Sequence, residues 1–166
     1  MASRARVRRT ALAVGAALLL PVGVAQAAPA GDDTTGSRGI GDPYYPTYGN
    51  GGYDVDHYGI HIHYTPKTDK LVGRTVIKAH ATQEALSRFN LDFVLPVKSV
   101  KVNGLKAAYK QGKHELVVTP QDALHATGKM EVEVRYAGVP GKIRSEGINP
   151  WIRTDDGVAS VGESAI

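Results

Sequence analysis

The sequence predicts an all-β domain of antiparallel strands, arranged as a β-sandwich or as saddle-like sheets. Three observations support this prediction. Short runs of alternating apolar and polar residues recur from residue 53 onward, turn-forming residues separate these runs, and no segment has the spacing of a long amphipathic helix. A parallel α/β fold is excluded, because parallel strands need long crossover connections that are usually helices.

The first expected strand is YDVDHYGIHIHY, residues 53–64. Its side chains alternate between two sets: Tyr58, Ile60, Ile62 and Tyr64 on one face, and His57, Gly59, His61 and His63 on the other. An apolar set and a polar set with a period of two are typical of a half-buried strand. The apolar set is therefore expected to face the core.

The later strands are expected at residues 71–83, 88–93, 97–102, 105–110, 113–120 and 129–138, with two short strands within 148–161. Asn103-Gly104 predicts a hairpin with a type I′ turn, because both central positions of that turn need positive φ. Residues 121–128 are the only helix-like piece, a single turn that is expected to end at Gly128.

The N-terminal residues 1–27 have the pattern of a cleavable signal peptide. Four arginines precede the apolar run 11–24, and Ala25-Gln26-Ala27 fits an A-x-A cleavage site. The sequence therefore predicts export and secretion, with no membrane anchor after cleavage. Arg8 and Arg9 suit a twin-arginine signal, and the general-secretion route fits equally well.

Two further segments follow the signal peptide. Residues 28–52 are rich in Gly, Pro and Asp and are expected to be a linker and a loop that leads into the domain. Its tyrosines Tyr44, Tyr45 and Tyr48 are expected either to pack on the domain or to form an aromatic patch for a ligand. Residues 53–166 are expected to be one β domain that is incomplete at its C-terminus.

Charge and cysteine content exclude several partners and sites. The chain has 20 basic and 16 acidic residues, and removal of the four signal-peptide arginines leaves 16 of each. This balance gives no support for a nucleic-acid partner. The chain has no cysteine, so disulfides, cysteine-ligated metals and thiol nucleophiles are excluded.

His61 and His63 are the only metal candidates that share a strand face at close spacing. Both could reach one Zn²⁺, but the sequence offers no third ligand, and His57 lies about 13 Å from His61 by strand rise. The polar face of a half-buried sheet is the simpler interpretation. We therefore predict no bound metal.

No residue pattern predicts a catalytic site. His114-Glu115 begins like a zinc-peptidase motif, but that motif needs a helix and a second histidine where Val118 stands. His80 and His125 stand alone, no G-x-S-x-G occurs, and Glu131 and Glu133 are expected on the solvated face of a strand. Trp151 is expected to anchor packing at the edge of the domain. No cofactor motif is present.

Five pieces of the chain, in this order and spacing, resemble the N-terminal domain of secreted bacterial zinc aminopeptidases of the aminopeptidase N family. They are GDPYYPTYGNGGYDVDHY, ATQEALSRFNLDF, VKVNG, HELVVTP and GINPWIRTDDG. The resemblance covers about residues 39–163. It implies a saddle of β-sheets that precedes a thermolysin-like catalytic domain, and this agrees with the all-β prediction.

The resemblance also implies the chemistry of the complete enzyme. In the family, zinc is held by the two histidines of H-E-x-x-H and a later glutamate, and a G-x-M-E-N loop holds the amine of the peptide substrate. None of these motifs occurs in this sequence, and His61 and His63 match no family ligand. We therefore expect zinc and peptide substrates for the complete enzyme only.

The favoured hypothesis is that this chain is the N-terminal β domain of a secreted zinc aminopeptidase and is inactive alone. Its partner would be its own catalytic domain, which would cover an unpaired strand edge and an apolar surface. The alternative is a free-standing secreted β-sandwich module that binds a polymer or protein through Tyr44, Tyr45, Tyr48 and Trp151.

Overall fold

The computed structural model describes residues 34–46, 48–144, 149–155 and 157–160. The chain divides into two units, Met1–Gly31 and Asp32–Ile166, and all described residues belong to the second unit. The predicted signal peptide therefore lies outside the described residues. Among the described residues, no helix has both the length and the apolar character that crossing a membrane requires.

The second unit is built almost entirely from strands. These are β1 (Tyr53–Thr65), β2 (Lys70–Ala81), β3 (Phe89–Asp92), β4 (Val97–Val102), β5 (Leu105–Lys106), β6 (Ala108–Gln111), β7 (Glu115–Thr119), β8 (Lys129–Gly138), β9 (Trp151–Arg153) and β10 (Val158–Ser160). Two 3₁₀ turns, Pro66–Thr68 and Pro140–Lys142, are its only described helical pieces. The predicted all-β class is confirmed.

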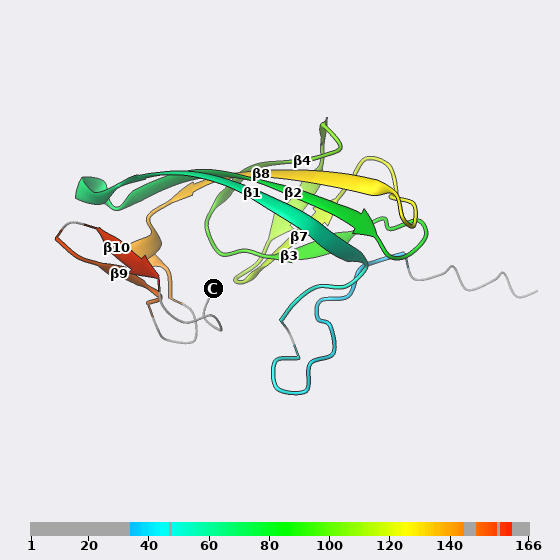
Figure 1. Ribbon diagram of the computed structural model, residues 1–166, viewed down its shortest axis with the longest axis horizontal. Coiled ribbons are helices and arrows are strands. Elements are labelled where there is room, and N and C mark those ends of the chain that lie inside the picture. The colour runs from blue at the N-terminus through cyan, green and yellow to red at the C-terminus, as the bar shows by residue number, and fades with distance from the viewer. Residues whose placement is uncertain (1–33, 47, 145–148, 156, 161–166) are drawn as a thin grey trace, which may run out of the picture. The chain divides into compact units, whose positions relative to one another are not determined.

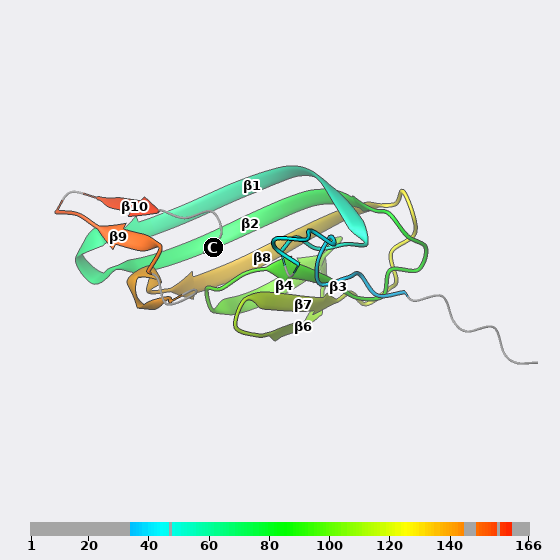
Figure 2. The same cartoon turned by 90° about the horizontal axis from the view of Figure 1, so that it is seen from below.

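The strands form three antiparallel sheets. The first has the order β1-β2-β8-β4-β5, the second β3-β7-β6, and β9 pairs with β10 in the third. Figures 1 and 2 show the three-stranded sheet over one end of the first sheet, and β9 and β10 near its other end. The arrangement is a sandwich at one end and a more open sheet toward the other.

The hydrophobic core lies between the five-stranded and three-stranded sheets. From the smaller sheet, Phe89, Leu116 and Val118 are fully buried. They meet residues such as Ile77 and Val132 on the larger sheet, which are 5% and 0% exposed. The alternation of apolar and polar residues places one face of β2, β4 and β8 in this core, as the sequence predicts.

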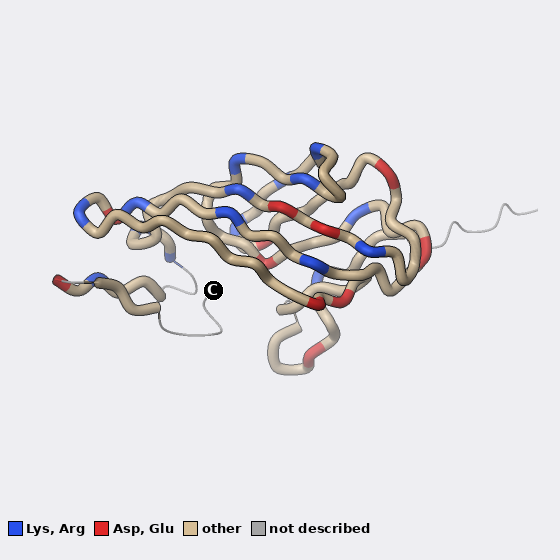
Figure 3. Tube along the Cα trace, turned by 45° about the horizontal axis from the view of Figure 1, so that its top comes forward, with Lys and Arg blue, Asp and Glu red and all other residues tan. Residues whose placement is uncertain are grey.

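The outer face of the large sheet carries charges of both signs, as Figure 3 shows along β2, β8 and β4. Glu133 on β8 lies 2.9 Å from Arg135 and 3.6 Å from Arg74 on β2. Arg74 and Arg135 lie directly opposite each other, and Glu133 offsets the repulsion between them because it lies close to both. Glu131 and Glu133 belong to this polar face, as expected.

The segment 105–110, expected as one strand, is divided between two sheets. Leu105 pairs with Val102 in the large sheet, whereas Ala108 pairs with Thr119 in the small one. Ala107 lies at the crossing, is 3% exposed, and donates its N–H to the Val100 carbonyl at 3.0 Å. A small residue fits here because the chain passes through the core between the layers.

The hairpin signal Asn103-Gly104 is confirmed, since both residues have positive φ, 49° and 81°. The helical turn expected for residues 121–128 is wrong. Leu124 instead exchanges two backbone hydrogen bonds with Leu86, at 2.8 and 3.0 Å, and Ala126 forms a bridge to Ala81. Burial of the Leu124 side chain favours this extended pairing over a short helix, which has little stability of its own.

Candidate functional site

The apolar face of β1 is open to solvent along its centre, which corrects the expectation that it is buried. Tyr58, Ile60 and Ile62 are 53%, 62% and 58% exposed. Only the ends of this face are partly covered, at Tyr53 and Val55 and again at Tyr64. A run of three large exposed side chains on one strand face is unusual for an isolated domain.

This open face continues the face that builds the core. Tyr58 lies opposite Ile77, and Ile60 and Ile62 lie opposite Thr75 and Gly73 on β2. An irregularity between Val55 and His57 leaves Asp56 without a direct partner and keeps Tyr53 and Tyr58 on the same face. The period of two therefore identified correctly which side chains of β1 share the core-facing side of the sheet. No layer of the described residues covers the centre of that side on β1.

A groove of about 630 Å³ runs along this face. Its floor comes from β1, β2 and β8, and its side walls come from the loop before β1 and from the end of β3. The apolar and aromatic lining includes Tyr58, Ile60, Phe93, Val134 and Tyr136. Such a lining fits apolar side chains better than a charged ligand.

Two polar groups lie among the residues that line the groove. The Tyr53 hydroxyl donates to the Asn90 carbonyl at 2.8 Å, and burial raises the pKa of this phenol. The side-chain oxygen of Asn50 is buried and has no hydrogen-bond partner among the described residues. Tyr53 therefore acts as a neutral structural donor, and Asn50 offers a free acceptor.

The buried Asp69 organises the far end of the β1–β2 hairpin, a role that no sequence pattern predicted. Its carboxylate accepts hydrogen bonds from the Tyr64 hydroxyl at 2.8 Å, the Gly141 N–H at 3.0 Å and the Trp151 indole N–H at 3.2 Å. Asp69 has φ 52°, a left-handed conformation that Asp and Asn tolerate better than most residues. This carboxylate therefore ties three segments together.

Trp151 is a packing anchor, as the sequence predicts. Its ring packs edge-on against Tyr64, with 5.4 Å between ring centroids. It is therefore held at the β1–β2 hairpin end and does not join the tyrosines of the N-terminal loop. The four aromatic residues expected to form one binding surface are not brought together.

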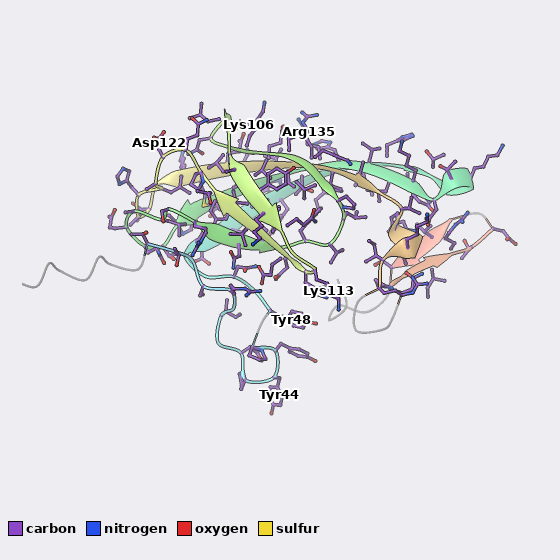
Figure 4. The ribbon with its side chains drawn as sticks, turned by 180° about the vertical axis from the view of Figure 1, so that it is seen from behind. Tyr44, Tyr48, Lys106, Lys113, Asp122 and Arg135 are labelled. Atoms are coloured by element: carbon purple, nitrogen blue, oxygen red, sulfur yellow. The ribbon has the colours of Figure 1, made fainter. Side chains whose placement is uncertain are left out.

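The loop before β1 docks through its backbone, while two of its tyrosines project outward. Gly36 donates to the Arg88 carbonyl at 2.8 Å, and Thr82 donates to the Gly52 carbonyl at 3.0 Å. Tyr44 and Tyr45 are 87% and 52% exposed, and Figure 4 shows Tyr44 at the tip of the loop. Tyr45 stacks on Tyr48 at 5.3 Å. The loop is anchored, but Tyr44 itself does not pack on the domain.

His61 and His63 lie on the outer face of β1, and both are exposed. The cross-strand neighbour of His61 is Arg74, a cation that would disfavour a metal ion. Within the described ranges, no group of three His, Cys, Asp or Glu residues could hold a metal. The described residues do not fit the zinc that the sequence resemblance implies, so no catalytic step is derived through that metal.

The other histidines lie apart from one another. His80 is 3.3 Å from Asp56, and His125 is 3.7 Å from Glu84; all four side chains are substantially exposed. His114-Glu115 stands at the start of a strand and not on a helix, which agrees with rejection of the zinc-peptidase motif.

Comparison with family models and with curated protein sequences gave no match. Solved structures did match. An M1 zinc metallopeptidase from Deinococcus radiodurans aligns with a TM-score of 0.62 and 27% identity, over 76% of this chain and 30% of that chain. A mutant of the enzyme from the same organism, bound to a Tyr-Ser-Ala substrate, gives a TM-score of 0.63 and 27% identity over 75% and 30%.

This chain thus spans about 30% of the length of the peptidases that it matches. The match in fold agrees with the resemblance in the quoted sequence pieces. The described sheets therefore have the fold found in M1 zinc metallopeptidases, and the coverage of the match is that of an all-β N-terminal domain of such an enzyme.

Proposed function

We propose that this chain serves as the N-terminal β domain of an exported zinc aminopeptidase, which removes N-terminal residues from peptides. The observation that carries the proposal is the 27% identity with M1 zinc metallopeptidases over three quarters of this chain. The described residues offer no fitting zinc site, so the chain alone is expected to be inactive. Export is proposed from the signal pattern of residues 1–27.

The native secreted product provides the first test. An antibody raised against residues 53–137 should isolate a protein several times heavier than this chain. That protein should release amino acids from aminoacyl chromogenic substrates, lose this activity with a chelator, and regain it with Zn²⁺. A native product with the mass of residues 28–166 and no such activity would contradict the proposal.

We further propose that the open face formed by Tyr58, Ile60 and Ile62 packs against another part of the same peptidase. Three exposed apolar side chains next to an unpaired strand edge favour burial by a neighbouring domain. Ile60→Glu should have little effect on the unfolding of this chain alone. In the native product it should lower thermal stability, whereas His61→Glu, on the opposite face of the same strand, should not.

A binding module remains a second candidate, favoured by the exposure of Tyr44 and Tyr45 on an anchored loop. Aromatic rings on such a loop can stack on sugar rings of a polysaccharide. The test is retention of the purified chain on cell-wall polysaccharide. Retention should be lost in Tyr44→Ala/Tyr45→Ala but kept in Tyr109→Ala, and equal retention of both variants would discard this candidate.

A further inference from the structure

A second cavity, of about 560 Å³, lies over the outer face of the three-stranded sheet. Residues 35–38 of the N-terminal loop form one wall, and β3, β6 and β7 form the floor. The polar and charged side chains that line it include Arg38, Arg88, Asn90, Lys110 and Glu115. Unlike the groove beside β1, this cavity is lined mainly by polar and charged groups.

Three cations converge on the cavity from three different segments. Arg38 comes from the N-terminal loop, Arg88 directly precedes β3, and Lys110 lies on β6. Throughout the described part of the chain, none of these three side chains makes a hydrogen bond or an ion pair with another residue. Their charges are therefore available to an anion.

Glu115 is the fourth charged group of the cavity, and it is 9% exposed. Its Oε2 atom is buried and has no hydrogen-bond partner among the described residues. Asp92 lies directly opposite it on β3. Burial and the Asp92 charge raise the pKa of Glu115, and Arg38 opposes this shift. A buried carboxylate without a donor is costly, so it is suited to accept a hydrogen bond from a ligand.

The backbone around the cavity is fixed by hydrogen bonds. Gly36 donates to the Arg88 carbonyl at 2.8 Å, Gly51 to the Ser37 carbonyl at 3.1 Å, and Gly112 to the Glu115 carbonyl at 2.7 Å. A Cβ at Gly36 would collide with the Gly51 carbonyl, so this close approach requires glycine. The loop that carries Arg38 is therefore held against the sheet that carries Glu115.

We propose that this cavity binds a phosphate group accompanied by a hydroxyl donor, with Arg38, Arg88 and Lys110 holding the phosphate oxygens and Glu115 accepting from the hydroxyl. Arginine and lysine are the usual partners of phosphate oxygens. The hydroxyl is either the remaining P–OH of inorganic phosphate or an alcohol of a phosphorylated polyol. The site is independent of peptide hydrolysis and of the function proposed above.

A comparison of phosphate with sulfate distinguishes binding that needs a hydroxyl donor from nonspecific attraction of anions. At pH 7.5 sulfate has oxygen geometry similar to that of phosphate but no proton to donate, so an ionised Glu115 would repel it. Sites built to accept a hydrogen bond reject analogues that lack the donor, because the buried acceptor is left unpaired. Calorimetric titration of the purified full chain at matched ionic strength should therefore show saturable binding of phosphate, and binding of sulfate at least about tenfold weaker.

Two variants test the assigned residues. Arg88→Gln should weaken phosphate binding about tenfold, the loss expected for one charge-assisted contact. Glu115→Gln places an amide donor where the carboxylate stood, so sulfate binding should improve and discrimination should fall. Lys106→Gln is the matched control, because Lys106 lies on β5, does not line the cavity, and should bind as the unmodified chain does. In the view of Figure 4, Lys106 lies near the top of the domain and Lys113 lies lower, at the turn between β6 and β7.

A second measurement keeps the test independent of the stability of the variants. In the unmodified chain, phosphate should shift the amide resonances of Gly36 and Gly112, while those of β9 stay unchanged. Glycerol phosphate binding more tightly than inorganic phosphate would assign the site to phosphorylated polyols, and the reverse would assign it to free phosphate. Equal affinity for phosphate and sulfate, or binding insensitive to both Arg88→Gln and Glu115→Gln, would overturn the proposal.

Discussion

The neighbouring strands β1 and β2 bury their apolar side chains to very different extents. Ile77 and Ile60 lie on the same sheet face on neighbouring strands, yet Ile77 is 5% exposed and Ile60 is 62% exposed. The difference arises because the three-stranded sheet packs over β2 and leaves the edge strand β1 open: Tyr58, the direct partner of Ile77, is 53% exposed. An apolar strand face therefore needs another layer packed over it. The extent of that layer determines which residues contribute most to the free energy of unfolding.

The largest expected effect tests this difference directly. Ile77→Ala should lower the free energy of unfolding by about 2–5 kcal/mol, because it leaves a cavity in the closed part of the sandwich. Ile60→Ala makes the same chemical change on the open part and should alter it by no more than about 0.5 kcal/mol. Urea unfolding of both variants measures the comparison, and equal losses would mean that the β1 face is covered in solution.

The second prediction concerns the anchor at the open end. Asp69→Ala leaves the Trp151 and Tyr64 donors and the Gly141 N–H without their acceptor, so it should cost about 1–3 kcal/mol. Trp151 is the only tryptophan, so its fluorescence should shift to the red as its ring becomes more exposed.

Asp69→Asn is the control for the anchor. The asparagine side chain keeps one acceptor oxygen and tolerates the left-handed conformation. Its substitution should therefore lower the free energy of unfolding less than Asp69→Ala does. Emission and unfolding of Asp69→Ala identical to those of the unmodified chain would show that β9 is held by other contacts.

A third prediction uses the buried carboxylate on the outer face of the small sheet. Burial raises the pKa of Glu115, so the folded state binds its proton more readily than the unfolded state does. The charged form therefore destabilises the fold at neutral pH, and this cost disappears as the pH falls below the ordinary carboxyl range. Glu115→Gln should stabilise the chain at pH 7 but not at pH 3, and a gain independent of pH would contradict this.

The smallest effect is expected on the exposed face of the large sheet. The hydrogen bond from Arg135 holds the pKa of Glu133 below its ordinary value. This pair therefore adds stability above that value and loses it as the pH falls through the folded pKa. Arg135→Gln should cost less than about 1 kcal/mol at pH 7 and nothing at pH 2, as measured by thermal unfolding. A loss that persists at pH 2 would point to packing of the arginine stem instead.

Local signals in the sequence predicted the features that short-range geometry decides. Asn103-Gly104 forms its hairpin because few residue pairs other than these adopt two consecutive positive φ values. The strand β8 follows the alternation of apolar residues, since a period of two places one side chain set on one face. The absence of family catalytic motifs was likewise visible in the sequence alone.

Long-range contacts decided the features that the sequence did not reveal. Residues 121–128 are extended because Leu124 pairs with Leu86, and the expected strand 105–110 changes sheet at Ala107. Asp69 and Glu115 are buried by segments distant in the chain, so neither position has a local signature.

The sequence by itself determined the all-β class, the tight turns and the polar and apolar faces, because backbone geometry links these to neighbouring residues. Only the tertiary structure decided which part of each apolar face is covered and which charged groups meet in one cavity. The physical reason is that burial and electrostatic environment depend on residues far away along the chain. The open face of β1 and the cavity around Glu115 both result from tertiary contacts of this kind.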